Sequence, residues 1–228
     1  ETLWSDAPVS HIVVTPPVPS FPLNPNKADW SVWDFPDVVD HWNFPGYEGK
    51  KMTVSVYSNC EQVELFLNGE SLGKQENTAD KKNTLVWEVP YAHGILKAVS
   101  YNKGGEVGTA TLESAGKVEK IRLSADRTEI VADGNDLSYI TLELVDSKGI
   151  RNQLAEELVE FSIAGDATIE GVGNANPMSI ESFVANSRKT WRGSNLLVVR
   201  SGKSSGRIIV TAKVKALPVA SITITQKK

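Results

Sequence analysis

The chain is dominated by short runs in which apolar and polar residues alternate. Val54 and Val56 stand at alternate positions in the run 52–58, as do Val63, Leu65 and Leu67 in the run 62–67. A period of two puts successive side chains on opposite faces of an extended chain, so each run is predicted to be a half-buried β-strand. Asn68-Gly69 follows the second run, and these two residue types tolerate the positive φ angles that a tight hairpin turn requires. The pattern therefore predicts an all-β fold.

The same alternation continues through a first series of strands that ends near residue 115. The strands predicted in this series are 53–58, 62–67, 70–75, 84–89, 95–102 and 106–112. Turn-forming residues separate the later strands, at 92–94 and at Asn102-Lys-Gly-Gly105. This series supplies enough strands for one β-sandwich, with its core in residues 51–115.

A second series begins after Ser114-Ala-Gly116. Apolar residues again occupy every second position in 140–144 and 208–214, and turn signals stand at Asp133-Gly134 and at 146–149. Residues 116–228 are therefore predicted to form a second sandwich. The fold class expected for the whole chain is two tandem immunoglobulin-like β-sandwiches.

Residues 1–50 form a lead-in of a different character, with eight prolines and four tryptophans. Proline lacks the N–H group that a sheet interior needs, so this segment is predicted to run as an irregular part of the first domain. Two local elements are expected within it: an edge strand at His11-Ile-Val-Val14 and a short helix over Asp34–His41.

Composition limits the classes of partner. The net charge of −4 gives no general attraction to nucleic acid, and the short basic run of Arg188, Lys189 and Arg192 is no domain-wide basic face. No apolar run approaches the ~20 residues that span a bilayer. A single cysteine, Cys60, excludes an internal disulfide and a cysteine-based zinc site, and it is expected to be a small buried hydrophobe rather than a reactive thiol. Neither nucleic acid nor a membrane is predicted as a partner.

No catalytic or metal-binding constellation is evident. His11, His41 and His93 are scattered, and no strand–turn–helix nucleophile elbow accompanies them. The oxygen-rich side chains of the stretch 133–136 are candidate calcium ligands. The stretch lacks the twelve-residue loop and closing glutamate of an EF-hand, so a β-turn is favoured. The sequence thus predicts no catalytic residue, no metal and no cofactor.

Aromatic residues of the lead-in are the candidate carbohydrate-binding residues. These are Trp30, Trp33, Trp42 and Tyr47, with Phe44 beside them. Exposed rings can stack on the apolar faces of sugars, whereas buried rings would pin the proline-rich segment to the sandwich or to another domain. Packing is the favoured interpretation, and sugar contact is the alternative.

The stretch 173–195 lacks alternation over most of its length. A connection of this length is more often a functional loop than a passive one, and its apolar content favours a packed Ω-loop. We expect it to present a polar face to another part of a larger protein. A self-packed flap without a partner is the alternative.

Several motifs give the chain a family resemblance. The segment from Val54 to Gly73 resembles the domain that follows the catalytic barrel in family 2 glycoside hydrolases of the β-galactosidase type. Matching motifs continue along most of the chain: Trp4-Ser-Asp6, Trp42-Asn-Phe-Pro-Gly-Tyr-Glu-Gly49, Trp87-Glu-Val-Pro-Tyr91, Gly94–Tyr101, Gly171-Val-Gly-Asn174, Glu181-Ser-Phe183 and Val199-Arg-Ser-Gly202. The chain departs from the pattern in a longer proline-rich stretch after His11 and in Ile180, where a polar residue is expected.

The resemblance implies a role and a location. Such enzymes carry their paired catalytic carboxylates on a (β/α)₈ barrel, and no strand–helix alternation of that kind occurs here, so no catalytic residue is carried over. The chain, which begins at Glu1 without an initiator methionine or signal peptide, is expected to be a non-catalytic C-terminal fragment of a periplasmic or extracellular enzyme. It would brace the barrel of the same parent chain and shape substrate access. The alternatives are a carbohydrate-binding module, with carbohydrate as the partner, and an immunoglobulin-like cell-surface spacer.

Overall fold

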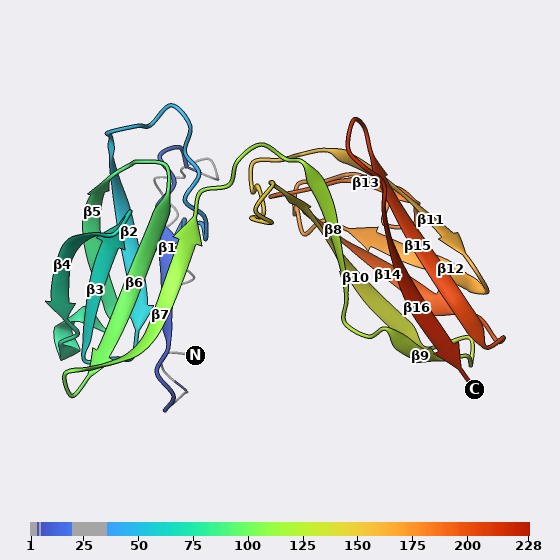
Figure 1. The fold of residues 1–228 in the computed structure, drawn as a ribbon, viewed down its shortest axis with the longest axis horizontal. Coiled ribbons are helices and arrows are strands. Elements are labelled where there is room, and N and C mark those ends of the chain that lie inside the picture. The colour runs from blue at the N-terminus through green and yellow to red at the C-terminus, as the bar shows by residue number, and fades with distance from the viewer. Residues whose placement is uncertain (1–3, 5, 20–35) are drawn as a thin grey trace, which may run out of the picture. The chain divides into compact units, whose positions relative to one another are not determined.

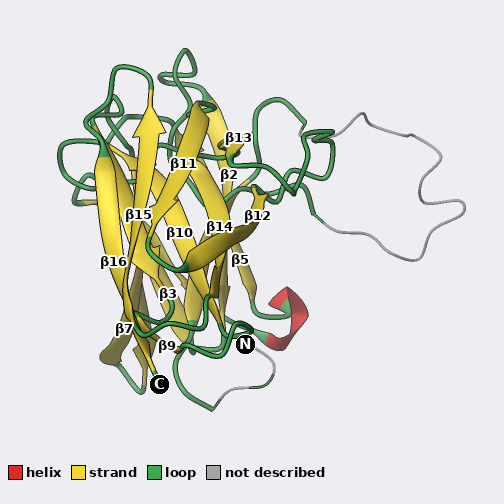
Figure 2. Ribbon diagram, turned by 90° about the vertical axis from the view of Figure 1, so that its right-hand side faces the viewer, coloured by secondary structure: helices red, strands yellow, loops and turns green. Residues whose placement is uncertain are grey.

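The computed structural model describes residue 4 and residues 6–19 and 36–228. The chain divides into two compact units, Glu1–Ser114 and Ala115–Lys228. Strands are the main secondary structure of both units, as Figure 2 shows in yellow. The expectation of an all-β fold is confirmed. No helix among the described residues is long and apolar enough to cross a membrane.

Unit 1 consists of two antiparallel sheets, with strand orders β1-β2-β5 and β4-β3-β6-β7 (Figure 1). Its elements are β1 (Ser10–Val14), β2 (Lys51–Ser58), β3 (Gln62–Leu67), β4 (Glu70–Glu76), the 3₁₀ turn η1 (Ala79–Lys81), β5 (Thr84–Pro90), β6 (Ile95–Asn102) and β7 (Gly105–Glu113). Each of the six strands predicted in the first series is present. The predicted edge strand is present as well, because β1 pairs only with β2 in its sheet.

The β3–β4 hairpin turns at Asn68 and Gly69, which both have positive φ angles, 51° and 89°. The side chain of Asn68 also fixes the start of β6, because its Oδ1 atom accepts a 2.8 Å hydrogen bond from the N–H of Ile95. A side chain at Gly94 would collide with that amide, since a Cβ atom there would lie 1.8 Å from Asn68 Oδ1. The predicted turn therefore also positions the neighbouring strand.

The core of unit 1 lies between its two sheets. Val54 and Val56 of β2 are fully buried against Leu65 of β3 and Leu96 of β6. Burying an aliphatic side chain of this size stabilises a fold by roughly 1.5–3 kcal/mol. Trp87 of β5 is also buried, as expected, and its indole N–H donates a 3.3 Å hydrogen bond to the Gly73 carbonyl.

The lead-in joins the sheet edge rather than forming the expected helix. In the described part of Asp34–His41, residues 36–41 contain no helix, so that prediction is wrong there. Val14 and Val39 instead exchange two backbone hydrogen bonds of 2.8 Å. Non-local pairing with β1 satisfies backbone groups that a helix would have paired locally.

Unit 2 also has two sheets, with strand orders β12-β14-β10-β8 and β13-β11-β15-β16-β9. Its strands are β8 (Lys120–Ala125), β9 (Glu129–Val131), β10 (Leu137–Val145), β11 (Leu158–Ala164), β12 (Ala167–Gly173), β13 (Ser187–Lys189), β14 (Ser194–Ser201), β15 (Gly206–Val214) and β16 (Ala220–Lys227). All pairings are antiparallel except the one between β16 and β9. No prediction covered β9, β11 and β13, although Val159, Phe161 and Ile163 alternate with polar residues along β11.

Side chains of both sheets fill the core of unit 2. Leu142 of β10, Leu197 of β14, Ile208 of β15 and Ile224 of β16 are fully buried in it. This cluster includes no residue of unit 1, so each unit has its own core. Separate cores are what two folding units of ordinary domain size require.

A buried carboxylate fixes the entry into unit 2. The side chain of Asp146 accepts backbone hydrogen bonds from Gly116 (2.8 Å), Lys148 (3.0 Å) and Ile150 (2.9 Å). Burial raises the pKa of Asp146, but these three hydrogen bonds and the nearby charge of Lys148 outweigh it and hold the pKa below its ordinary value. Asp146 therefore ties the connection between the units to the turn after β10.

Candidate functional site: an apolar loop over a buried arginine

Trp42 packs inside unit 1. Its side chain has no exposed surface, and its indole N–H donates a 2.8 Å hydrogen bond to the Ala92 carbonyl. The ring makes edge contacts with Tyr91 and Phe44, with centroid distances of 5.0 and 6.0 Å. Because neither ring face is open, Trp42 cannot be the sugar platform that the sequence offered as an alternative. It anchors the lead-in.

Of the other candidate aromatic residues, the structure describes only Tyr47. Tyr47 is half-buried against the core of unit 1, and the ammonium of Lys50 lies 4.7 Å from its ring centroid. Trp30 and Trp33 lie outside the described residues, so the structure does not address sugar contact at those positions. The described members of the predicted aromatic set therefore form no open stacking surface.

The acidic stretch 133–136 forms a turn. The Oδ1 atom of Asp133 accepts 2.8 Å hydrogen bonds from the N–H groups of Asn135 and Asp136. Asp136 bonds to the N–H of Val131 and forms a 2.8 Å ion pair with Arg127. These hydrogen bonds, those from the backbone first, lower the pKa of both carboxylates. Each carboxylate therefore has a structural role in the turn that was favoured from the sequence.

The loop between β12 and β13, residues 174–186, is termed the apolar loop because its large apolar side chains face solvent. The exposed fractions are 81% for Met178, 100% for Ile180, 62% for Phe183 and 84% for Val184. The expectation of a packed loop with a polar outer face is therefore wrong. Exposed apolar side chains that gather in one segment mark interaction surfaces more often than single ones do.

A buried arginine lies beneath this loop. Arg188 of β13 has no exposed surface, and its guanidinium donates hydrogen bonds to the carbonyl oxygens of Glu181 (3.0 Å) and Val172 (3.4 Å). A third bond of 3.1 Å goes to the hydroxyl of Ser179. The ring of Phe183 covers the cation, with its centroid 4.3 Å from the guanidinium carbon. One side chain thus holds the end of β12 and two points of the loop.

The charge of Arg188 is buried without a carboxylate partner among the described residues. The side chain of Glu181 accepts hydrogen bonds of 3.0 Å from the Ser179 hydroxyl and from the N–H of Lys189 instead. The Nε atom of Arg188 has no hydrogen-bond partner within the described part of the chain. Burying an unpaired cation costs free energy. The hydrogen bonds from its other donors, which fix the loop, offset that cost.

Asparagine side chains fix the rest of the apolar loop. Asn174 donates a 2.9 Å hydrogen bond to the Lys189 carbonyl and accepts one of 3.1 Å from the N–H of Asn176. Asn176 in turn accepts a 2.9 Å bond from the N–H of Met178. Hydrogen bonds, together with the contact between Phe183 and Arg188, therefore maintain its conformation, and Met178, Ile180 and Val184 remain exposed.

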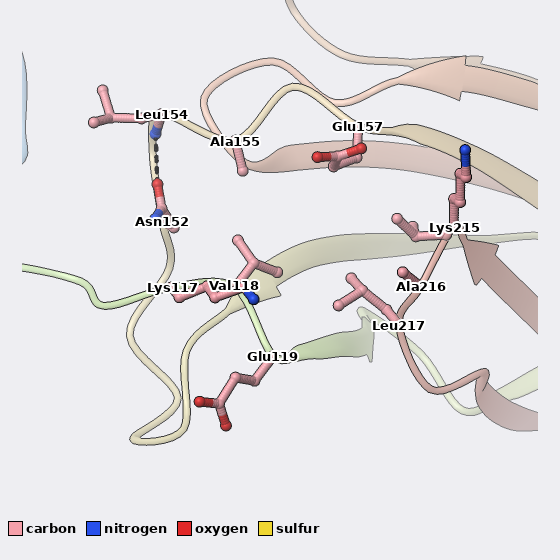
Figure 3. A pocket seen from close by; sticks show the side chains of 11 residues that line it. Lys117, Val118, Glu119, Asn152, Leu154, Ala155, Glu157, Lys215, Ala216 and Leu217 are labelled. Atoms are coloured by element: carbon pink, nitrogen blue, oxygen red, sulfur yellow. Dashed lines mark hydrogen bonds between the residues drawn. The ribbon is translucent and has the colours of Figure 1, made fainter.

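A hollow of about 720 Å³ lies at one end of unit 2 (Figure 3). Val118, Ala155 and Leu217 contribute apolar surface that packs against the core, and Leu154 donates a 2.9 Å hydrogen bond to Asn152 Oδ1. Lysine and glutamate side chains complete its lining. The lining contains neither histidine nor cysteine, and its titratable groups are those lysines and glutamates.

Comparisons with known proteins identify the chain's relatives. Residues 121–223 match the family described as glycoside hydrolase family 2 C-terminal domain 5, and residues 49–108 match a domain of unknown function. A structure of a glycosyl hydrolase family 2 member from Bacteroides cellulosilyticus is 99% identical, with a TM-score of 0.98 over the whole of this chain and 29% of that one. The chain is a C-terminal region of a family 2 glycoside hydrolase.

Two more distant relatives also match this glycoside hydrolase region. A β-galactosidase of Bacteroides ovatus is 32% identical over 89% of the chain and 24% of that protein. The structure of a β-glycosidase from Bacteroides vulgatus, 26% identical, has a TM-score of 0.82 over 98% of this chain and 25% of that one. The region therefore spans about a quarter of the length of these relatives. The apolar loop lies within the part that matches the C-terminal domain family.

Proposed function

We propose that this region braces the catalytic domain of its own polypeptide, and that the apolar loop is the docking surface. The observation that carries the proposal is the exposure of Met178, Ile180, Phe183 and Val184 on a loop that the buried Arg188 holds in place. Removing a side chain of this size from water is worth roughly 1.5–3 kcal/mol. A surface of four such side chains is therefore a substantial source of docking energy.

The fixed conformation of the loop favours docking over a self-packed flap. A flap would bury its apolar side chains against its own unit, whereas the side chain of Ile180 is 100% exposed. Because hydrogen bonds already order the backbone, little conformational entropy remains to be lost when a partner covers the loop. Ile180 is also the position at which the sequence departs from the polar residue expected there.

The length of the relatives supports the choice of partner. About three quarters of the length of the matched proteins lies outside this region, and a covalently attached partner is present at high effective concentration. By the family resemblance, that polypeptide includes the barrel with the paired carboxylates. Shaping substrate access follows as a secondary role. The extracytoplasmic location stays a prediction.

Amide hydrogen exchange on the 228-residue chain and on the complete polypeptide tests this function. We expect residues 176–186 to exchange more slowly in the complete polypeptide, because the partner covers them. The double variant Ile180→Ser, Val184→Ser should remove that extra protection and leave the isolated chain unchanged. Val219→Ser, which alters an exposed valine in the turn before β16, is the matched control. Equal protection of 176–186 in both proteins would refute docking.

A further inference from the structure

The sulfur atoms of the chain differ sharply in their access to solvent. The chain contains one cysteine and two methionines, and all three residues lie in its described part. Cys60 and Met52 are buried, with exposed fractions of 1% and 3%, whereas Met178 of the apolar loop is 81% exposed. Met178 therefore carries the one sulfur atom of this chain that solvent reaches freely.

The two buried sulfur atoms are protected by the fold of unit 1. Met52 of β2 packs in the core of that unit. Cys60 follows the same strand, and its N–H donates a 3.1 Å hydrogen bond to the Ser58 hydroxyl. An oxidant reaches either side chain only when this part of unit 1 opens. Because oxidation of sulfur follows exposure, Met178 is the preferred target.

The backbone around Met178 is held by bonds that do not involve its side chain. Its N–H donates a 2.9 Å hydrogen bond to Asn176 Oδ1, and the N–H of Ser179 donates one of 3.2 Å to the Asn176 carbonyl. The thioether contributes to neither bond. A chemical change at the sulfur therefore alters the surface of the apolar loop and leaves its backbone in place.

A peroxide supplies such a change. The sulfur attacks one oxygen of hydrogen peroxide, the O–O bond breaks, an S–O bond forms and water leaves, so the sulfur loses the two electrons that the peroxide gains. The product, methionine sulfoxide, is polar where the thioether was apolar. Covering a polar group without a hydrogen-bond partner costs free energy. Burial beneath a partner thus protects the sulfur, and the sulfoxide in turn opposes burial.

We propose that Met178 is an oxidation site that regulates docking: a peroxide converts its thioether to a sulfoxide, and the sulfoxide weakens the docking of the apolar loop. The inference rests on the proposed docking function and names a regulation of that same surface. Ile180, Phe183 and Val184 contain no sulfur, so the response depends on Met178. Methionine sulfoxide reductases reverse the modification, which makes it a switch.

Treatment with dilute hydrogen peroxide, followed by mass spectrometry of digests, tests the accessibility of the sulfur. In the 228-residue chain we expect Met178 to oxidise at least about tenfold faster than Met52, which is the internal control. In the complete polypeptide Met178 should oxidise at least about tenfold more slowly than in the 228-residue chain, because the docked partner covers it.

Amide exchange at 176–186 in the complete polypeptide tests the regulation. After prolonged peroxide treatment we expect these amides to exchange about tenfold faster or more, which corresponds to about 1.4 kcal/mol, and to recover after incubation with methionine sulfoxide reductases. Met178→Leu should make this exchange insensitive to peroxide, which separates Met178 from methionines elsewhere in the polypeptide. Met52→Leu is the matched control and should respond to peroxide as the parent does.

The outcomes separate this inference from the proposed function. Equal rates of Met178 oxidation in the 228-residue chain and in the complete polypeptide would refute docking, and the regulation with it. Slow oxidation in the complete polypeptide, followed by unchanged amide exchange once Met178 is oxidised, would overturn the regulation alone. Peroxide-induced loss of protection in Met178→Leu would also overturn it, because the sensitive group would then lie elsewhere.

Discussion

Arg188 donates a 3.0 Å hydrogen bond to the carbonyl oxygen of Glu181, and this contact joins β13 to the middle of the apolar loop. The same guanidinium reaches the end of β12 through Val172. The loop is thus fixed from below by a buried cation while its apolar side chains face outward. The buried Arg188 therefore stabilises this segment, whereas the apolar side chains form its exposed surface.

Arg188→Met should loosen the apolar loop. The variant removes the cation but leaves the carbonyls of Val172 and Glu181 without their donor, at a cost of about 1–3 kcal/mol for a buried group. Amide exchange at 176–186 should accelerate, and unit 2 should unfold at a lower temperature. Arg207→Met, which alters an exposed arginine of β15, is the control and should change neither. Unchanged exchange in Arg188→Met would contradict this role.

Leu65→Asp and Leu142→Asp should each unfold one unit. Both leucines are fully buried, in separate cores, and an unpaired carboxylate there costs at least about 3 kcal/mol. Calorimetry of Leu65→Asp should show the loss of one transition while the other persists, and Leu142→Asp should show the reverse. Simultaneous loss of both transitions in either variant would mean that the units fold as one.

Asp146 should make unit 2 sensitive to acid. Its pKa is lower in the folded chain than the ordinary value of about 3.9, so its contribution to stability is present above that value and is lost as the pH falls through the folded pKa. Asp146→Asn should reduce stability at pH 7 and flatten its decline between about pH 5 and the folded pKa. Thermal unfolding at several pH values measures this effect, and parallel pH profiles for both chains would contradict it.

The 228-residue chain should not hydrolyse glycosides. Retaining hydrolysis needs two carboxyl groups about 5–5.5 Å apart around the bond. Asp133, Asp136 and Asp166 instead hold backbone N–H groups, and each has a lowered pKa that suits no general acid. We expect no turnover of an aryl β-galactoside or aryl β-glucuronide. Turnover that an aspartate or glutamate substitution within the chain abolishes would refute the prediction.

The strands were predictable because their signals are local. Alternation along β2, β3, β10 and β15 reports which face of an extended chain is buried, and Asn68-Gly69 reports a backbone conformation that few other residues tolerate. The short pairing of β13 gave no such signal, since three residues are too few to show a period.

The sequence by itself determined the all-β class and most of the strands, because periodicity and turn chemistry depend on neighbouring residues. Only the tertiary structure decided that Trp42 is buried, that Ile180 is exposed and that Arg188 lies beneath its own loop. Burial of a tryptophan, or of a cation that carbonyl groups satisfy, depends on segments far apart along the chain. The candidate surfaces follow from those non-local contacts, whereas the strands that carry them follow from local pattern.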